Sequence, residues 1–266
     1  MSFFTQTYSQ RLTTSLLTFS CILGALVVNG LSNFFPPKGL NVGQISRQIF
    51  GTVLITPASY AFAIWGLIYI GLITYGIYQF QSDSRRDAVI QSLNTKLMFA
   101  CVSQMIWILL FTWQLFWLSV VAIVAILGSL ILAYQALGQD KRNTQNHLSP
   151  KRYWQVHVPF SIYFAWISVA TIVNVACALT FVNWSGWGIS PVMWTIVMIG
   201  VSFILGTIAL VQRQDYAFAT VFVWAYGAIA LRQVDNLPIF FSAGLGIIGL
   251  CSLMVALGFK KKVNRY

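Results

Sequence analysis

The stretch Pro57–Phe80 constrains the fold of this chain more than any other. It contains 24 residues and no charge, so as a helix rising about 1.5 Å per residue it can cross a hydrocarbon core of about 30 Å. Phe62, Trp65 and Tyr69 are spaced i, i+3 and i+7, which places them on one helical face. This aromatic stripe predicts either a packed seam between helices or the wall of a pocket for a flat, apolar ligand.

The composition excludes an ordinary soluble protein. Hydrophobic residues make up 58% of the chain and charged residues only 8%, whereas a soluble domain keeps roughly a quarter of its residues charged. The 16 Lys and Arg residues outnumber five acidic ones, all of them Asp. Because these cations lie mainly between apolar segments, membrane orientation explains them better than a nucleic-acid partner.

Eight apolar segments follow one another along the chain, each bounded by charged or turn-forming residues. We therefore predict an all-α integral membrane protein with about eight transmembrane helices. The first segment is long for a signal peptide and lacks a clear cleavage site, so we expect it to be retained. The segments are approximately 12–31, 57–80, 97–115, 116–137, 156–181, 190–211, 216–231 and 237–259.

The loop 32–50 is the only long connection on its side of the predicted membrane. Its Pro-Pro pair and Gly39 forbid a continuous helix. Its aromatic and aliphatic residues (Phe34, Phe35, Ile49 and Phe50) predict that it folds back on the helix ends. The loop is either a lid over the bundle or a tether between two helices.

The distribution of basic residues predicts the orientation. With the N-terminus inside, thirteen Lys and Arg residues fall in inner segments and three, Lys38, Arg47 and Arg232, in outer ones. This ratio satisfies the positive-inside rule. We expect both termini in the cytoplasm, the loop 32–50 outside, and residence in a bacterial inner membrane.

Three motifs resemble one known membrane family. The stretch Pro57–Tyr69, with Phe62 and Trp65-Gly-Leu-Ile-Tyr69, resembles the second helix of the tryptophan-rich sensory protein/translocator protein (TspO/MBR) family. Trp107-Ile-Leu-Leu-Phe111 resembles its third helix, and the Trp-x-x-x-Ala-x-x-x-Asn pattern of Trp166–Asn174 resembles its fifth. Their order along the chain is also the family's order.

The resemblance implies an architecture and a ligand class. It implies an antiparallel five-helix core over residues 1–181, and the remaining residues 182–266 would add three helices and a basic tail. Family members are often dimeric and bind porphyrins, haem and related tetrapyrroles near the first loop. The resemblance therefore implies a sensor or translocator with a haem or porphyrin ligand and no required cofactor. Its partners would be the lipid bilayer, this small molecule and a second copy of the chain.

The expected ligand-binding residues come from the helices that carry the motifs. Aromatic faces stack on planar molecules, and an indole N–H or an amide can bond a polar edge. The competing interpretation is a packed aromatic core with Asn174 hydrogen-bonded to a neighbouring helix. The set is Pro57, Phe62, Trp65, Tyr69, Trp107, Phe111, Trp166, Ala170 and Asn174.

Catalysis and metal binding find little support in the sequence. The spans contain no Glu and no acid pair, which disfavours hydrolysis and a proton relay. The four cysteines form no C-x-x-C pair. His147 lies in a polar loop, and His157 at a helix edge is either an axial haem ligand or an ordinary hydrogen-bonded residue. Two alternatives stay open: a transporter of a small solute or lipid, and a membrane enzyme that degrades porphyrin.

The C-terminal helices carry two further signals. Arg213 with Asp215, and Arg232 with Asp235, suggest surface ion pairs at the membrane edge. Gly244, Gly246 and Gly249 predict close helix packing or a dimer face.

Overall fold

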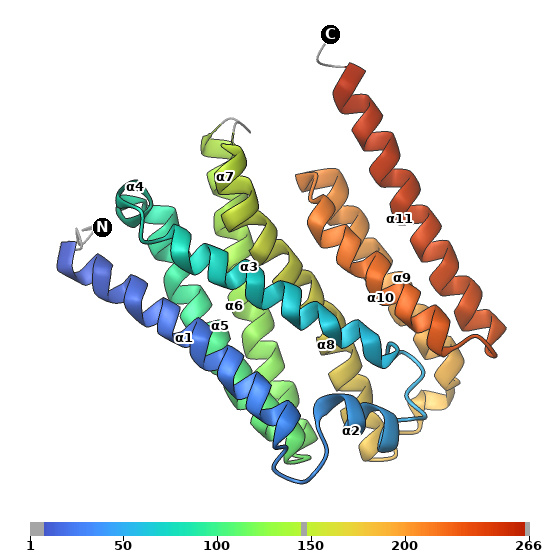
Figure 1. Cartoon of the computed structure of the whole chain (residues 1–266). Coiled ribbons are helices and arrows are strands. Elements are labelled where there is room, and N and C mark those ends of the chain that lie inside the picture. The colour runs from blue at the N-terminus through green and yellow to red at the C-terminus, as the bar shows by residue number, and fades with distance from the viewer. Residues whose placement is uncertain (1–7, 145–147, 264–266) are drawn as a thin grey trace.

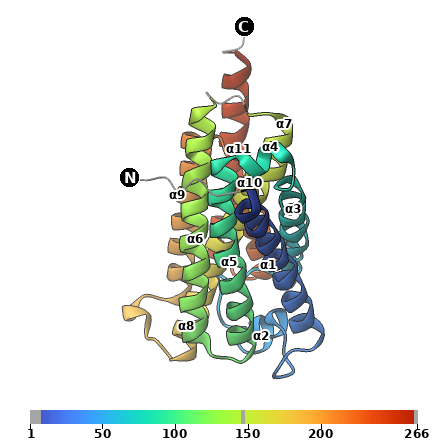
Figure 2. The same ribbon diagram turned by 90° about the vertical axis from the view of Figure 1, so that its left-hand side faces the viewer.

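A computed structural model describes residues 8–144 and 148–263, so His147 and Arg265 lie outside the described residues. The described residues contain helices and connections and no strand, which confirms the all-α class. Figures 1 and 2 show the long helices running side by side, with α2 at one end and α4 and α7 at the other.

Five long helices form the N-terminal bundle. The tight connection after Thr112 makes the third and fourth of them antiparallel neighbours, and Gln114 there takes a left-handed backbone conformation (φ 63°). The five helices are α1 (Tyr8–Phe34), α3 (Ile64–Tyr78), α5 (Ala88–Thr112), α6 (Phe116–Asn143) and α8 (Val158–Phe181).

Short elements join these helices. They are α2 (Val42–Gln48), the 3-10 turn η1 (Ser59–Ala63), α4 (Ser82–Arg86), α7 (Pro150–Arg152) and the π-helical turn η2 (Tyr153–His157). The predicted helix over 57–80 therefore begins later than expected. The reason is that the backbone N–H of Ala58 donates to Ala228 O on a distant helix (3.0 Å), which fixes the chain outside the helical path.

Three further helices complete the chain: α9 (Pro191–Arg213), α10 (Tyr216–Arg232) and α11 (Leu237–Val263), with the 3-10 turn η3 (Gly186–Gly188) before them. Within the described part of the chain, seven helices are long and apolar enough to cross a membrane, whereas α10 has 17 residues. The chain is thus an integral membrane protein.

The loop between α1 and α3 folds back only in part. Ile49 is half-buried and Phe50 is buried, as expected, but Phe34 and Phe35 are 80% and 77% exposed. The expectation for these two residues was wrong because α1 ends at Phe34 and the chain leaves the bundle there before α2 returns to it (Figure 1).

The predicted ion pairs of the C-terminal helices were also wrong. Neither Arg213 with Asp215 nor Arg232 with Asp235 forms an ion pair among the residues described. Asp215 instead accepts the backbone N–H of Phe218 at the start of α10 (3.0 Å). Arg232 donates to loop carbonyls, because the returning loop presents unpaired oxygens beside it.

The glycines of α11 serve packing within the chain. A Cβ at Gly246 would lie 3.0 Å from the Tyr226 ring, and one at Gly249 would lie 2.7 Å from the Phe203 ring. These two glycines therefore let α11 approach α10 and α9 closely. Gly244 has open space around it.

Candidate functional site

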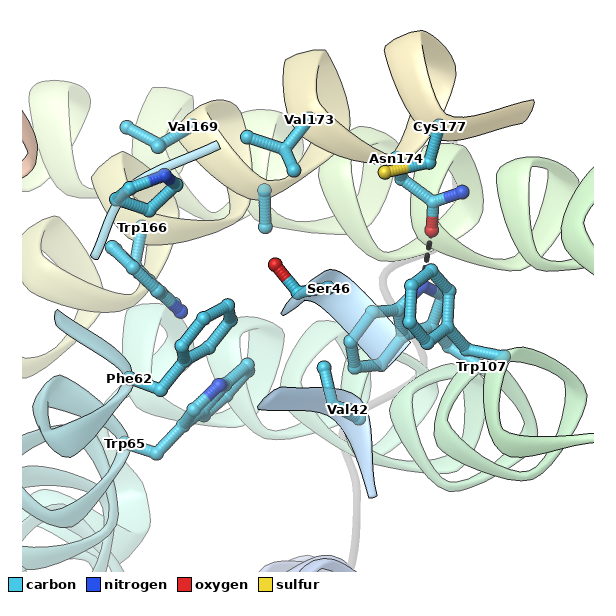
Figure 3. Close-up of a pocket in the computed structure, with 13 residues that line it drawn as sticks. Val42, Ser46, Phe62, Trp65, Trp107, Trp166, Val169, Val173, Asn174 and Cys177 are labelled. Carbon is cyan, nitrogen blue, oxygen red and sulfur yellow. Dashed lines mark hydrogen bonds between the residues drawn. The ribbon is translucent and has the colours of Figure 1, made fainter. Parts of the chain in front are cut away.

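A small aromatic cavity lies between α3, α5 and α8 and next to α2 (Figure 3). Its volume is about 30 Å³, which is room for a water molecule or two. The wall is almost entirely apolar, with Asn174 and Ser46 as its polar side chains.

Eight of the nine expected ligand-binding residues line this cavity. They are Pro57, Phe62, Trp65, Trp107, Phe111, Trp166, Ala170 and Asn174. The ninth, Tyr69, lies one turn deeper along α3, with its ring 6.0 Å from that of Trp65. Its hydroxyl donates to Ala25 O on α1 (3.0 Å), so Tyr69 joins helices below the cavity.

The rings around the cavity also pack against one another. Phe62 meets Trp166 edge-to-face at 6.0 Å between ring centroids, and Trp107 stacks on Phe111 at 5.5 Å. Trp107 and Trp166 are buried, whereas Trp65 and Phe62 are half-buried. The pocket and the packed seam predicted from the sequence therefore coexist in one place, and the rings of Phe62 in η1 and Trp65 in α3 are less enclosed than the other two.

Asn174 is hydrogen-bonded within the wall. Its Oδ1 accepts the indole N–H of Trp107 (2.6 Å), and its Nδ2 donates to Ser119 Oγ (3.0 Å). The amide thus links α8 to α5 and α6, as the competing interpretation of Asn174 expected.

A buried polar cluster forms the floor. Gln104 on α5 donates from Nε2 to the Tyr69 hydroxyl (2.7 Å) and accepts at Oε1 from the Tyr163 hydroxyl. The Tyr163 ring in turn lies against Trp65, which lines the cavity (6.1 Å). Each group that this cluster buries has a partner, which favours a rigid floor.

The cover of the cavity is α2, an element that the sequence interpretation missed. Val42 and Ser46 of α2 line the cavity at the end of the bundle where α2 lies (Figure 3). Asn41 and Gln44 form a capping box, in which Asn41 Oδ1 accepts from Gln44 N (2.9 Å) and Gln44 Oε1 from Asn41 N (2.8 Å). This Asn-x-x-Gln spacing was the available signal for a helix start in the loop.

The end of α10 contacts the chain that follows α2 and holds it in place. Arg232 donates to Gly51 O (3.2 Å), and Gln233 Nε2 to Leu54 O (2.9 Å). Trp224 donates its indole N–H to Ala61 O in η1 (3.1 Å). The position of α2 over the cavity therefore depends on a helix outside the five-helix core.

The sequence was compared with models of known protein families. The model of a family described as TSPO-like protein matches residues 15–256. The chain belongs to the TSPO-like family. Comparison with curated proteins and with solved structures finds no match.

The family match covers more of the chain than the sequence motifs did. The three sequence motifs of this TSPO-like protein lie within residues 12–181. The match to the family model continues through α9, α10 and most of α11. The helix that holds the cavity cover is thus part of the matched region.

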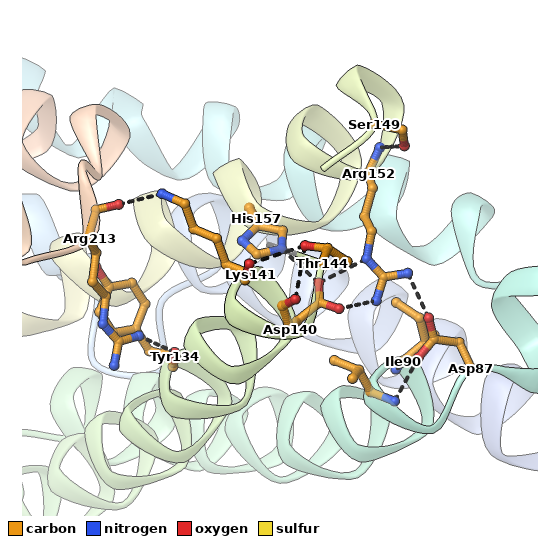
Figure 4. Close-up of polar contacts among 11 residues, drawn as sticks. Asp87, Ile90, Tyr134, Asp140, Lys141, Thr144, Ser149, Arg152, His157 and Arg213 are labelled. Carbon is orange, nitrogen blue, oxygen red and sulfur yellow. Dashed lines mark hydrogen bonds and ion pairs between the residues drawn. The ribbon is translucent and has the colours of Figure 1, made fainter. Parts of the chain in front are cut away.

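His157 of the TSPO-like chain lies outside the aromatic cavity. Its Nε2 is 3.0 Å from Asp140 Oδ2, and Arg152 forms a two-pronged ion pair with the same carboxylate (2.8 and 2.9 Å; Figure 4). This contact is the hydrogen-bonded role that the sequence left open for His157. Among the described residues, no group of His, Cys, Asp and Glu side chains could hold a metal ion.

Proposed function

We propose that this TSPO-like protein is a membrane receptor or translocator that binds a flat, apolar molecule of the porphyrin or haem type. The ligand would lie between α3, α5 and α8 beneath α2. The observation that carries the proposal is the convergence of Trp65, Trp107 and Trp166, from three helices, on one cavity. Indole faces offer a planar ligand large apolar contact areas.

Stacking would hold the ligand, because the wall offers no His, Asp or Glu. Asn174 Oδ1 already accepts from Trp107. A polar edge of the ligand would therefore meet the hydroxyl of Ser46 or displace the Trp107–Asn174 bond. Neither route supplies an axial ligand to an iron, so the wall favours a porphyrin held by stacking over a haem held through its metal.

Binding would require the cavity to open. Sites for drug-sized ligands have volumes of about 300–1,000 Å³, against about 30 Å³ here. The parts best suited to move are α2, a seven-residue helix, and the half-buried rings of Phe62 and Trp65. The loop would thus act as a lid that is closed when the site is empty.

We infer eight spans and an outward-facing lid. As a helix, α10 is ~26 Å long, which is close to the hydrocarbon thickness. The basic residues lie mainly at the end opposite α2, which favours placing that end in the cytoplasm and the lid outside, in a bacterial inner membrane.

The proposal is tested by absorbance titration of the purified protein with protoporphyrin and with haem. We expect a shifted Soret band that weakens in Trp166→Phe and Trp65→Phe. Trp154→Phe, which changes a 65% exposed indole away from the cavity, is the matched control. An unshifted Soret band would overturn the tetrapyrrole proposal. Loss of the bound porphyrin under illumination would instead show that the protein is a porphyrin-degrading enzyme. Uptake of a solute into proteoliposomes that contain the protein would show that it is a transporter.

A further inference from the structure

A second, larger cavity lies at the end of the molecule opposite α2. Its volume is about 1,010 Å³, and it separates α6 and α8 from α9 and α11. It shares no lining residue with the aromatic cavity, so any ligand there would be distinct from the one proposed above.

The lining of this cavity is strongly basic. It includes four cations, Lys141, Arg142, Arg213 and Lys260, and one carboxylate, that of Asp215. The Asp215 carboxylate is already occupied: Oδ2 accepts the hydroxyls of Tyr134 (2.9 Å) and Ser161 (2.6 Å), and Oδ1 the Phe218 N–H. The excess of positive charge favours an anionic ligand.

Arg213 is held in a defined position on this wall. Its guanidinium lies 4.2 Å from the centre of the Tyr134 ring and donates to Tyr134 O (Figure 4). Gly138 makes room for it, since a Cβ there would lie 2.7 Å from Arg213 Nη1. Lys141 Nζ donates to the backbone carbonyl Arg213 O (2.7 Å), so a second cation lies beside Arg213 on this wall. A guanidinium has five N–H donors, and its fork suits the oxygens of a phosphate.

Apolar side chains continue the cavity toward the membrane interior. Leu137 and Val158 line it from the core, and Val211 and Leu257 from the C-terminal helices. Val211 is 56% exposed, so the protein's own side chains leave this apolar wall open to lipid tails. A ligand matching both parts has an anionic head and an apolar body.

We propose that this cavity binds an anionic phospholipid, with its phosphate at Arg213 and Lys141 and its acyl chains along the apolar wall. Basic pockets between transmembrane helices at one membrane face recognise such headgroups. The lipid would fill the space between the five-helix core and α11 and so join the two parts of the protein.

The test measures lipid binding to the full-length protein in neutral detergent by native mass spectrometry. The probes are dioleoylphosphatidylglycerol and dioleoylphosphatidylcholine. We expect the wild type to retain the anionic lipid preferentially. Arg142→Gln with Lys260→Gln, two exposed cations, should reduce this preference about five-fold per charge removed. Lys38→Gln with Arg47→Gln removes two exposed charges at the opposite end and is the matched control.

Further variants separate binding from folding. Gly138→Ala should displace the Arg213 guanidinium and weaken anionic-lipid binding, while the thermal unfolding of the Arg142/Lys260 double variant should match that of the wild type. Equal retention of both lipids, or equal loss in the Lys38/Arg47 control, would overturn the proposal. Displacement of the lipid by inorganic phosphate at equimolar concentration would also overturn it, because a free anion would then be the ligand.

Discussion

Trp107 Nε1 donates a 2.6 Å hydrogen bond to Asn174 Oδ1, which ties α5 to α8 across the wall of the aromatic cavity. The two residues lie 67 positions apart in the chain, and both line the cavity. The bond gives one indole plane of the site a fixed orientation. The same bond occupies Asn174 Oδ1, so this oxygen is not free to bind a ligand while the bond to Trp107 is made.

Removing this indole donor should destabilise the protein. In Trp107→Phe, Asn174 keeps only its contact with Ser119, so we expect a loss of about 1 kcal/mol in the free energy of unfolding. Thermal unfolding in detergent measures it. Trp113→Phe is the control: this residue lies in the turn after α5 and is 49% exposed, so the change should affect stability little. Equal effects of the two changes would contradict a structural role for the bond.

The floor of the cavity should behave as one unit. Gln104→Leu leaves the Tyr163 hydroxyl without its acceptor, which should cost about 1–3 kcal/mol. Tyr163→Phe removes that hydroxyl. We expect the double variant to be less destabilised than the sum of the single variants, by about 0.5 kcal/mol or more. Strict additivity in the double-mutant cycle would show that the two side chains do not interact.

The sequence was sufficient for the long helices and for most of the lining of the aromatic cavity. Uncharged apolar runs long enough to cross a membrane admit little besides helices, and spacings of four and eight kept Trp107 with Phe111 and Trp166 with Asn174 on one face. It was not sufficient for the depth of Tyr69. Tyr69 shares a face with Trp65 but lies one turn further along α3, where its hydroxyl meets Ala25 O of α1, and spacing alone does not show where the cavity ends.

The lid interpretation of α2 depends on how easily it opens. Asn41→Ala removes the side-chain half of the capping box, which should cost the short helix about 1 kcal/mol. Amide hydrogen exchange over residues 42–48 should then quicken about five-fold, with α3 unchanged. Exchange that stays at the wild-type rate would mean that the rest of the loop, and not the cap, holds α2.

The charge network at the opposite end should stabilise the fold. Arg152 joins Asp140 on α6 to Asp87, which caps α5 (Figure 4). Arg152→Gln removes the ion-pair partner of Asp87 and leaves Asp140 with His157 alone, and we expect a loss of about 3 kcal/mol in the free energy of unfolding. Lys151→Gln, an exposed neighbour, should change it by less than about 0.5 kcal/mol. A loss no larger in Arg152→Gln than in Lys151→Gln would contradict this assignment.

This charge network could not be predicted from the sequence. Arg152 has one partner 12 residues away in the chain and another 65 away, and the count that predicted the orientation included only basic residues and left both aspartates out. The contacts of Arg232 could not be predicted either, since its acceptors are backbone oxygens about 180 residues earlier. Contacts of this kind depend on which helices become neighbours, which hydropathy leaves open.

The measurement that tests the central claim most directly is a structure of the protein determined with protoporphyrin present. We expect the macrocycle between the indoles of Trp65, Trp107 and Trp166, with α2 displaced from its position over the cavity. A macrocycle bound elsewhere, with α2 and the aromatic cavity unchanged, would contradict the account.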